Sequence, residues 1–306
     1  MPTGHHPTTT TDEATTRARA ALLAGIPVSE RRIRAAGIDT VVLEGGEGPP
    51  MVLLHGPGEA GVNWRWVIPD LVTTHRVVAP DLPAHGSTGI GDGDLDEGRV
   101  TDWLDEVIAA TCTSPPIVVG HVLGGAIAAR YAVRHGDRLA HLVLVDSLGL
   151  APFRPSRPFA TAFLRFVVRP TEPSYERFMA QCAFDLDRLR ADMDDDWTSF
   201  VTYNLALARA PNAKAGGRLF RRLGTPRIPD ADLARIAVPT CLIWGRHDRA
   251  LRLPVAEHAA QRHGWRLHVI DDSADDPARD QPAAFLRALR TAIAGSGPSS
   301  DHGGTP

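Results

Sequence analysis

The stretch VVGHVLGGAIAARYA, residues 118–132, decides the fold of this chain. Two valines lead into a turn flanked by Gly120 and Gly124, and a run of helix-forming residues follows. An apolar strand that passes through a glycine-rich turn straight into a helix is typical of a parallel sheet covered by helices. Small residues at the start of this helix allow it to lie close to the sheet. We therefore expect an α/β fold centred on this unit.

Short apolar runs alternate with helical patterns on both sides of this unit. Strands are predicted at residues 40–43, 51–54, 76–79, 117–119, 142–145, 241–244 and 267–270. Helices are predicted at residues 100–110, 126–135 and 282–294. Alternation of this kind predicts a mostly parallel sheet with helices on both faces.

The strand pattern disappears between residues 151 and 236, where helical stretches at 160–168, 174–181 and 197–208 replace it. We interpret residues 151–236 as a helical lid over the carboxyl ends of the strands, where open α/β sheets bind ligands. The core then comprises residues 29–150 and 237–294. Residues 1–28 are predicted to be a flexible tail and residues 295–306 a disordered one.

Composition narrows the range of partners and compartments. The chain has 306 residues, of which 43% are hydrophobic and 23% charged, and its formal net charge is −3. This balance predicts neither nucleic-acid nor membrane binding, and no apolar run is long enough to span a bilayer. Three cysteines without a CxxC pair fit reduced thiols, so a cytoplasmic location is expected. The sequence has no metal-ligand spacing and no dinucleotide fingerprint, so we expect neither a metal nor a cofactor.

Four stretches in order, LLHGPGEAG (53–61), APDLPAHGSTG (79–89), residues 118–132 and CLIWGRHDRA (241–250), resemble the α/β-hydrolase superfamily. The resemblance extends over nearly the whole chain between its two tails. It implies an α/β-hydrolase fold with a helical lid. It also implies that the turn after residue 120 is the nucleophile elbow of that superfamily.

The same resemblance exposes three departures from a serine hydrolase. The nucleophile position is Val122, which has no lone pair with which to attack. Asp248 matches the acid, but Asp275 stands where the histidine belongs. Pro57 follows the His-Gly pair and lacks the N–H that commonly forms half of the oxyanion hole, which leaves the amide of Leu123. These departures exclude acyl-enzyme chemistry at this turn.

The carboxyl groups are the remaining candidates for catalysis. If the fold brings Asp248 and Asp275 together, they are expected to share a proton, and one pKa then rises into the range useful for acid/base work. Alternatively, Asp275 points to solvent or caps the helix turn at Pro277, while Asp248 merely binds loop amides. Glu59 is a tentative third proton carrier, or else a solvated loop charge. His121 is expected to be a packed neighbour, and Asp146 a structural residue.

The pocket is expected to be apolar and suited to a small-molecule or peptide-like substrate. Its predicted lining residues are Pro57, Gly58, His121, Leu123 and Trp64.

Three hypotheses for function remain open. The first is a non-covalent acid/base enzyme of the epimerase, cyclase or lyase type acting on a small apolar metabolite. Its nearest precedent by resemblance is the atypical group of this fold that includes the bottromycin-pathway epimerase, where the triad is also lost. The second is a non-catalytic ligand-binding protein. The third is a hydrolase whose water is activated directly by a carboxylate.

Overall fold

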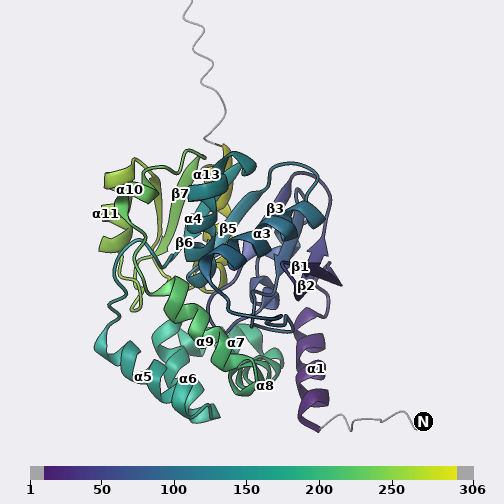
Figure 1. Ribbon diagram of the computed structural model, residues 1–306. Helices are drawn as coiled ribbons and strands as arrows, with labels where there is room; N and C mark the ends of the chain where they lie inside the picture. The colour runs from purple at the N-terminus through teal and green to yellow at the C-terminus, as the bar shows by residue number, and fades with distance from the viewer. Residues whose placement is uncertain (1–9, 295–306) are drawn as a thin grey trace, which may run out of the picture.

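A computed structural model describes residues 10–294 of the chain (Figure 1). Its centre is an eight-stranded sheet in the order β1-β2-β4-β3-β5-β6-β7-β8. The strands are β1 (Ser29–Ala35), β2 (Ile38–Gly45), β3 (Pro50–Leu54), β4 (Arg76–Pro80), β5 (Ile117–His121), β6 (His141–Val145), β7 (Thr240–Gly245) and β8 (Arg266–Ile270). β2 pairs antiparallel with both β1 and β4, and the other neighbours are parallel.

Helices flank this sheet on both faces. The α-helices are α1 (Thr10–Leu23), α2 (Ile68–Leu71), α3 (Glu97–Thr111), α4 (Leu123–His135), α5 (Arg157–Val168), α6 (Glu172–Cys182), α7 (Leu186–Met193), α8 (Asp196–Arg209), α9 (Ala213–Leu219), α10 (Asp230–Leu233), α11 (Pro254–His263), α12 (Pro277–Asp280) and α13 (Pro282–Ala294). Short 3₁₀ turns lie at η1 (Gly61–Trp64) and η2 (Gly136–Arg138), and a π-helical turn, η3 (Phe220–Gly224), extends α9. The predicted fold class, a mostly parallel sheet flanked by helices, is confirmed.

The central strands are buried because both faces of the sheet are covered. Every residue of β3 and β5 is buried, as expected of parallel strands that read as continuous apolar runs. β5 lies between β3 and β6, with Leu54 opposite Gly120 and His121 opposite Val145. The turn at residue 122 therefore leaves the middle of the sheet at the carboxyl ends of its strands.

Helices α5 to α9 gather below the sheet in Figure 1, with α1 beside α8. This part of the chain touches loops at the carboxyl ends of the strands. The backbone N–H of Ser156 donates to the carbonyl of Arg249, and the N–H of Asp275 donates to the carbonyl of Cys182. The helices between β6 and β7 therefore contact the loops that follow β7 and β8.

The sequence prediction missed strand β1. Its sequence, SERRIRA, is mostly exposed and charged, so it shows no apolar run. It exists because it forms a hairpin with β2 through Ala36 and Gly37, whose φ angles of 46° and 73° are those of a type I′ turn. Charged residues are common on such an exposed edge, where they discourage pairing with other chains.

The prediction of a flexible tail through residue 28 is wrong from residue 10 onward. Residues 10–23 form α1, in which Ala18 and Leu22 are buried. Arg19 donates to the hydroxyl of Tyr203 on α8 at 2.9 Å and to Glu30 at 2.9 Å. These few anchors were too sparse to stand out as an amphipathic pattern. Residues 1–9, and the predicted tail at 295–306, lie outside the described residues.

Within the described part of the chain, none of the helices combines the length and the apolar character needed to cross a membrane.

Candidate functional site

The turn from β5 to α4 carries Val122 at its apex. Val122 has φ 47° and ψ −101°, a region that β-branched residues rarely adopt. Its N–H donates to the carbonyl of Val145, and the N–H of Gly124 donates to the carbonyl of His55. A Cβ on Gly124 would lie 2.3 Å from the carbonyl oxygen of Leu54, so only glycine fits there. The strained turn is therefore present, with an apolar side chain at its apex.

Glu59 and His121 form an ion pair next to this turn. Oε2 of Glu59 accepts from the backbone N–H of Gly56 at 2.7 Å and lies 3.5 Å from Nδ1 of His121. Nε2 of His121 makes a 2.6 Å hydrogen bond to the carbonyl oxygen of Asp275. The side chains of Glu59 and His121 are 19% and 6% exposed. Glu59 is thus not the solvated loop charge that the sequence left as an alternative.

The pair is held in its charged form. Burial disfavours a charged imidazole, but Glu59, Asp276 and the Asp275 carbonyl outweigh it and raise the pKa of His121 to about 10. Burial likewise opposes the charged form of Glu59, but His121 outweighs it and lowers the Glu59 pKa to about 2. An imidazolium and a carboxylate therefore face each other at neutral pH.

A buried arginine lies close to three aspartates that follow β8. Arg279 lies 3.3 Å from Oδ1 of Asp275, 3.5 Å from Oδ2 of Asp276 and 3.4 Å from Oδ1 of Asp280. Its guanidinium also donates to the carbonyl of Cys182 at 3.1 Å. Only 4% of its side chain is exposed. Arg279 therefore joins this loop to the end of α6.

Asp275 is largely buried in this cluster, with 14% of its side chain exposed, and does not cap a helix. Burial raises its pKa to about 8, although Arg279 opposes the shift. The helix cap is its neighbour Asp276, whose side chain accepts from the N–H of Arg279. At neutral pH Asp275 is accordingly a neutral carboxylic acid that can donate a proton.

Asp248 and Asp146 form a second buried carboxyl pair. Oδ1 of Asp248 accepts from the N–H groups of Ala250 and Leu251 at 2.6 and 2.8 Å, and Oδ1 of Asp146 accepts from Gly245 at 3.0 Å. The Oδ2 atom of each is buried without a hydrogen-bond partner among the described residues. A proton shared between the two carboxyls would satisfy both atoms.

The pKa values of both carboxyl groups are raised, and burial is the largest cause in each case. Burial raises the pKa of Asp146 well above its usual value, and the charge of Asp248 is the second cause of this increase. Burial raises the pKa of Asp248 to about 6, against the opposing hydrogen bonds of the Leu251 and Ala250 amides. Asp146 is thus more than the structural residue that the sequence suggested.

The expectation that Asp248 and Asp275 share a proton needs correction. The carboxyl groups of Asp248 and Asp146 act on each other's pKa, whereas Oδ1 of Asp275 lies 3.3 Å from the guanidinium of Arg279. Asp248 and Asp275 interact only through their charges, and the charge of Asp248 adds to the raised pKa of Asp275. His121 interacts electrostatically with both, so the fold gathers these groups around one imidazolium.

The other predicted lining residues surround the same turn. The indole ring of Trp64 lies 6.2 Å from the ring of His121, edge to face. Gly58 is exposed with φ 77°, next to Pro57. Leu123 is the first residue of α4, where an N–H group has no acceptor within its own helix.

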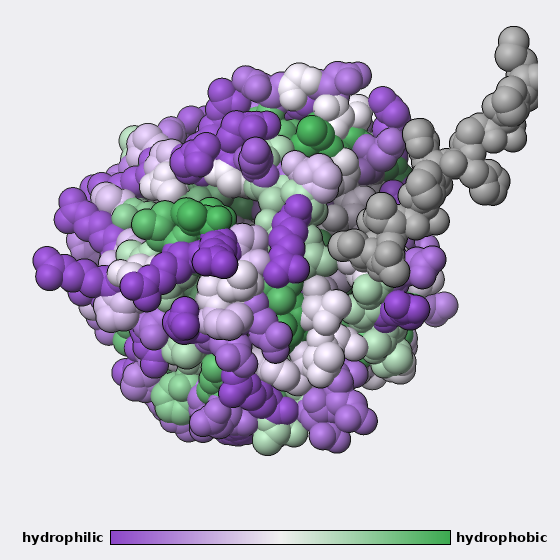
Figure 2. Space-filling view, turned by 90° about the horizontal axis from the view of Figure 1, so that it is seen from below, coloured by the Kyte–Doolittle hydropathy of each residue, from purple (hydrophilic) through white to green (hydrophobic). Residues whose placement is uncertain are grey.

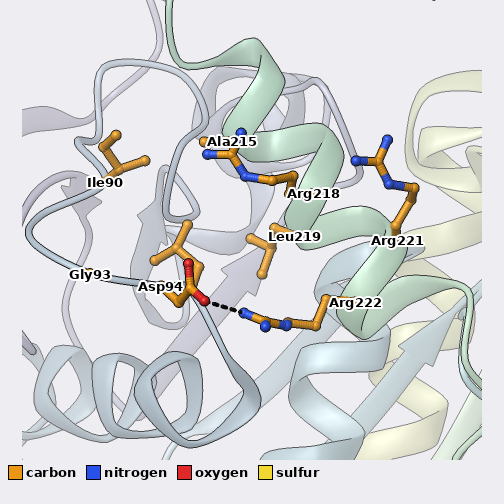
Figure 3. A pocket seen from close by; sticks show the side chains of 9 residues that line it. Ile90, Gly93, Asp94, Ala215, Arg218, Leu219, Arg221 and Arg222 are labelled. Atoms are coloured by element: carbon orange, nitrogen blue, oxygen red, sulfur yellow. Dashed lines mark ion pairs between the residues drawn. The ribbon is translucent and has the colours of Figure 1, made fainter.

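One hollow lies away from these residues. A groove of about 420 Å³ opens between the loop before α3 and the α9–η3 segment (Figure 3). It is lined by Ile90, Gly93, Asp94, Leu95, Ala215, Arg218, Leu219, Arg221 and Arg222. Arg222 lies 3.5 Å from Asp94 across it, and Arg221 points away from the loop. None of the predicted site residues lines this groove.

Sequence reasoning missed Arg279 and the pairing of Asp146. The first had a signal, because Asp275 and Asp276 precede Arg279 by four and three residues, the spacings typical of helical ion pairs. The second had none, since Asp146 and Asp248 follow strands nearly a hundred residues apart in the chain. Among the residues that the structure describes, no three His, Cys, Asp or Glu side chains are grouped as metal ligands.

Comparison with known proteins settles the family. The model of the family described as "Alpha/beta hydrolase family" matches residues 51–288. The chain belongs to the alpha/beta hydrolase family. The strained turn at Val122, called the elbow from here on, lies within the matched residues.

Among the relatives of this alpha/beta hydrolase are enzymes named for hydroxy-dienoic acids. It is 36% identical to 2-hydroxymuconate semialdehyde hydrolase of a Pseudomonas species over 129 residues, 41% of this chain but only 46% of that protein. It is 28% identical to 2-hydroxy-6-oxo-2,4-heptadienoate hydrolase of Pseudomonas putida over 86% of this chain and 96% of that protein. The structure of naproxen esterase from Bacillus subtilis is similar in fold, with a TM-score of 0.79 and 19% sequence identity over 93% of this chain and 99% of that chain.

Proposed function

We propose that this chain is a divergent alpha/beta hydrolase that lacks a covalent nucleophile and moves protons on a small apolar metabolite, in the manner of an epimerase, cyclase or lyase. The observation that carries the proposal is Val122 at the apex of the elbow. A valine side chain at this point presents no lone pair to a substrate. What remains around it is a set of proton-carrying groups.

Asp275 and Asp248 are the proposed proton carriers. Asp275, with a pKa raised to about 8 by burial, is protonated at neutral pH and serves as the acid. Asp248, with a pKa raised to about 6, is mostly ionised there and serves as the base. Asp146 is proposed to position Asp248. A proton leaves a substrate carbon for Asp248, and a proton from Asp275 reaches the substrate at another atom.

His121 and Glu59 are proposed to supply electrostatics. A fixed imidazolium next to the elbow stabilises negative charge that develops on a substrate oxygen during proton removal. This positive charge, together with the Leu123 amide, would replace the donor that Pro57 lacks. Glu59, whose pKa is lowered to about 2 chiefly by His121 against burial, is too weak a base for proton removal and keeps His121 charged.

A second candidate is hydrolysis with a water molecule activated by a carboxylate. The observation in its favour is that the named relatives are hydrolases. Asp248 would then take a proton from water rather than from carbon. Proton transfer places a hydrogen atom from the solvent in the product, whereas hydrolysis places an oxygen atom from the solvent there.

The probe we choose is 2-hydroxy-6-oxo-2,4-heptadienoate, which the name of one relative specifies. Its 2-hydroxyl group is an enol, so moving that proton to a chain carbon gives the keto form. In deuterated water, acid/base catalysis places deuterium on that carbon faster than in a protein-free control. In water labelled with oxygen-18, hydrolysis instead places the label in a product acid. Saturable binding with neither label would indicate a binding protein.

The matched variants are Asp275→Asn and Asp272→Asn. Asp272 is an exposed neighbour on the same loop, so its variant is expected to exchange deuterium at the wild-type rate. Asp275→Asn is expected to lose at least about a hundredfold in rate, as for a lost general acid, while it still binds the dienoate. Equal exchange by Asp275→Asn and wild type would refute the proposed role.

A further inference from the structure

Helix α5 has two apolar faces, and only one of them is covered. Its inward rings, Phe159, Phe163 and Phe166, pack against Phe178 of α6 at centroid distances of 5.5 to 5.6 Å. This aromatic packing secures α5 to the rest of the molecule. The helix therefore does not need its outward face in order to stay folded.

The outward face exposes three aliphatic side chains. Leu164 is 62% exposed, Val167 57% and Val168 75%. Figure 2, seen from below, shows hydrophobic residues gathered between hydrophilic ones on the side where Figure 1 places α5. Aliphatic side chains clustered on a surface in this way mark an interaction site more often than scattered ones do.

Arginines surround this patch. Residues 151–171 contain Arg154, Arg157, Arg165 and Arg169, all exposed, and no aspartate or glutamate. Arg157, Leu164 and Val168 follow the i, i+7, i+11 spacing of one helical stripe, and Arg165 lies beside it. Between residues 13 and 294, none of the four arginines forms an ion pair. The net charge of −3 for the whole chain conceals this local excess of positive charge.

The acids of α6 form no ion pair with these four arginines among the described residues. Glu176 on α6 already pairs with Arg190 at 2.6 Å, and Arg190 also lies 3.6 Å from Asp187. Glu172 opens α6 after the arginine-rich segment, and Arg177 on the same helix adds another exposed positive charge. An anionic partner therefore meets uncompensated guanidinium groups.

The combination of exposed aliphatic groups and arginines fits a lipid surface better than a second protein. A stable protein interface takes about 20 to 30 residues from each side, far more than this single helical stripe offers. A bilayer accepts a few aliphatic side chains below its headgroups while anionic headgroups attract the arginines. From this complementarity we propose that the outward face of α5 docks on anionic lipid bilayers. This inference is independent of the chemistry proposed above.

The test is flotation of the full chain with vesicles through a density gradient. Vesicles of phosphatidylcholine that also contain phosphatidylglycerol are expected to carry the protein upward. Vesicles of phosphatidylcholine alone are expected to bind at least about tenfold more weakly, because the arginines then lack anionic partners. Raised salt is expected to reduce the binding, since exposed charges are screened.

Two double variants separate the apolar and the charged contributions. Leu164→Ser with Val168→Ser is expected to weaken binding by at least about tenfold through lost apolar insertion. Arg157→Gln with Arg165→Gln is expected to weaken it by about tenfold and to flatten its salt dependence. The matched controls are Ile90→Ser, an exposed aliphatic on another loop, and Arg32→Gln on strand β1. Both controls are expected to float like the wild type.

Three outcomes would overturn the inference. The first is no flotation with phosphatidylglycerol vesicles, and the second is flotation that the α5 variants retain in full. The third is a dimer by light scattering that Leu164→Ser with Val168→Ser converts to a monomer without any lipid binding, because the face is then a contact between two copies. Since all the substituted side chains are exposed, circular dichroism is expected to show unchanged folding in every variant.

Discussion

Nδ1 of His121 lies 3.5 Å from Oε2 of Glu59, with the far side of the ring hydrogen-bonded to the Asp275 carbonyl. This pair ties the residue before the elbow to two loops that follow other strands. It also places a permanent positive charge among the buried carboxyl groups.

Stability is expected to depend on pH through His121. Its pKa is raised from 6.5 to about 10, so the folded state binds the proton more tightly than the unfolded state does. The stabilisation is complete below pH 6.5 and is lost as the pH rises toward 10. His121→Gln is expected to be less stable than the wild type by on the order of a few kcal/mol at pH 6, and by much less at pH 10. Urea unfolding at several pH values measures this difference. The exposed His258, changed to glutamine, is the control and is expected to match the wild type throughout.

Asp275 is expected to limit stability on the alkaline side. Its pKa is raised from 3.8 to about 8, so the stability it confers is complete below pH 3.8 and falls as the pH rises toward 8. Asp275→Asn keeps the shape but cannot ionise. Its free energy of unfolding relative to the wild type is therefore expected to rise between pH 5 and pH 9. A difference that stays constant over this range, as expected for the control Asp272→Asn, would contradict the buried neutral state of Asp275.

Arg279→Met is expected to cost about 3 to 5 kcal/mol of stability, because it leaves buried carboxylates without their cation. Chemical denaturation at neutral pH measures the loss. Arg287 on α13 is exposed, and Arg287→Met is expected to change stability by less than about 0.5 kcal/mol. Similar losses in the two variants would show that the Arg279 cluster contributes no more than a surface charge.

The close packing of α4 against β3 predicts opposite effects of alanine at two glycines. Gly124→Ala is expected to destabilise the fold by about 3 kcal/mol or more, because its Cβ would lie 2.3 Å from the Leu54 carbonyl oxygen. Gly98→Ala in α3 meets no atom closer than 3.5 Å and is expected to be neutral or to stabilise by up to about 1 kcal/mol. Thermal unfolding of both variants tests this contrast, and a mild effect at Gly124 would contradict the described elbow.

A serine at the elbow is expected not to restore covalent chemistry. In Val122→Ser the adjacent His121 is protonated and engaged by Glu59, so it cannot accept the serine proton. A fluorophosphonate probe is therefore expected to leave both the wild type and Val122→Ser unlabelled, while an ordinary serine hydrolase in the same tube is labelled. Rapid labelling of Val122→Ser would reveal a base that this structure does not assign.

The local sequence pattern was sufficient to predict the buried strands, but it did not predict β1 and α1 at the edge of the fold. Strands such as β5 and β6 are runs of β-favouring apolar residues, and their burial on both faces follows from that composition. β1 and α1 are stabilised by a hairpin turn and by a few anchors such as Arg19. Their sequences alone do not reveal these contacts.

The elbow was predictable because a strand, a glycine turn and a helix are adjacent in the chain. The carboxyl partners were not, because pKa values depend on burial and on neighbours that the sequence does not place. The sequence paired Asp248 with Asp275, whereas in the fold Asp248 and Asp146 act on each other's pKa and Arg279 lies beside Asp275.

The sequence by itself determined the order of the buried strands and the valine at position 122, since both follow from residue identity and short-range periodicity. Only the tertiary structure decided which acid meets which base. That choice depends on how the loops after β3, β5, β6, β7 and β8 meet at one edge of the sheet. There, burial penalises every unpaired charge, so each ionisable group keeps a proton or finds an opposite charge.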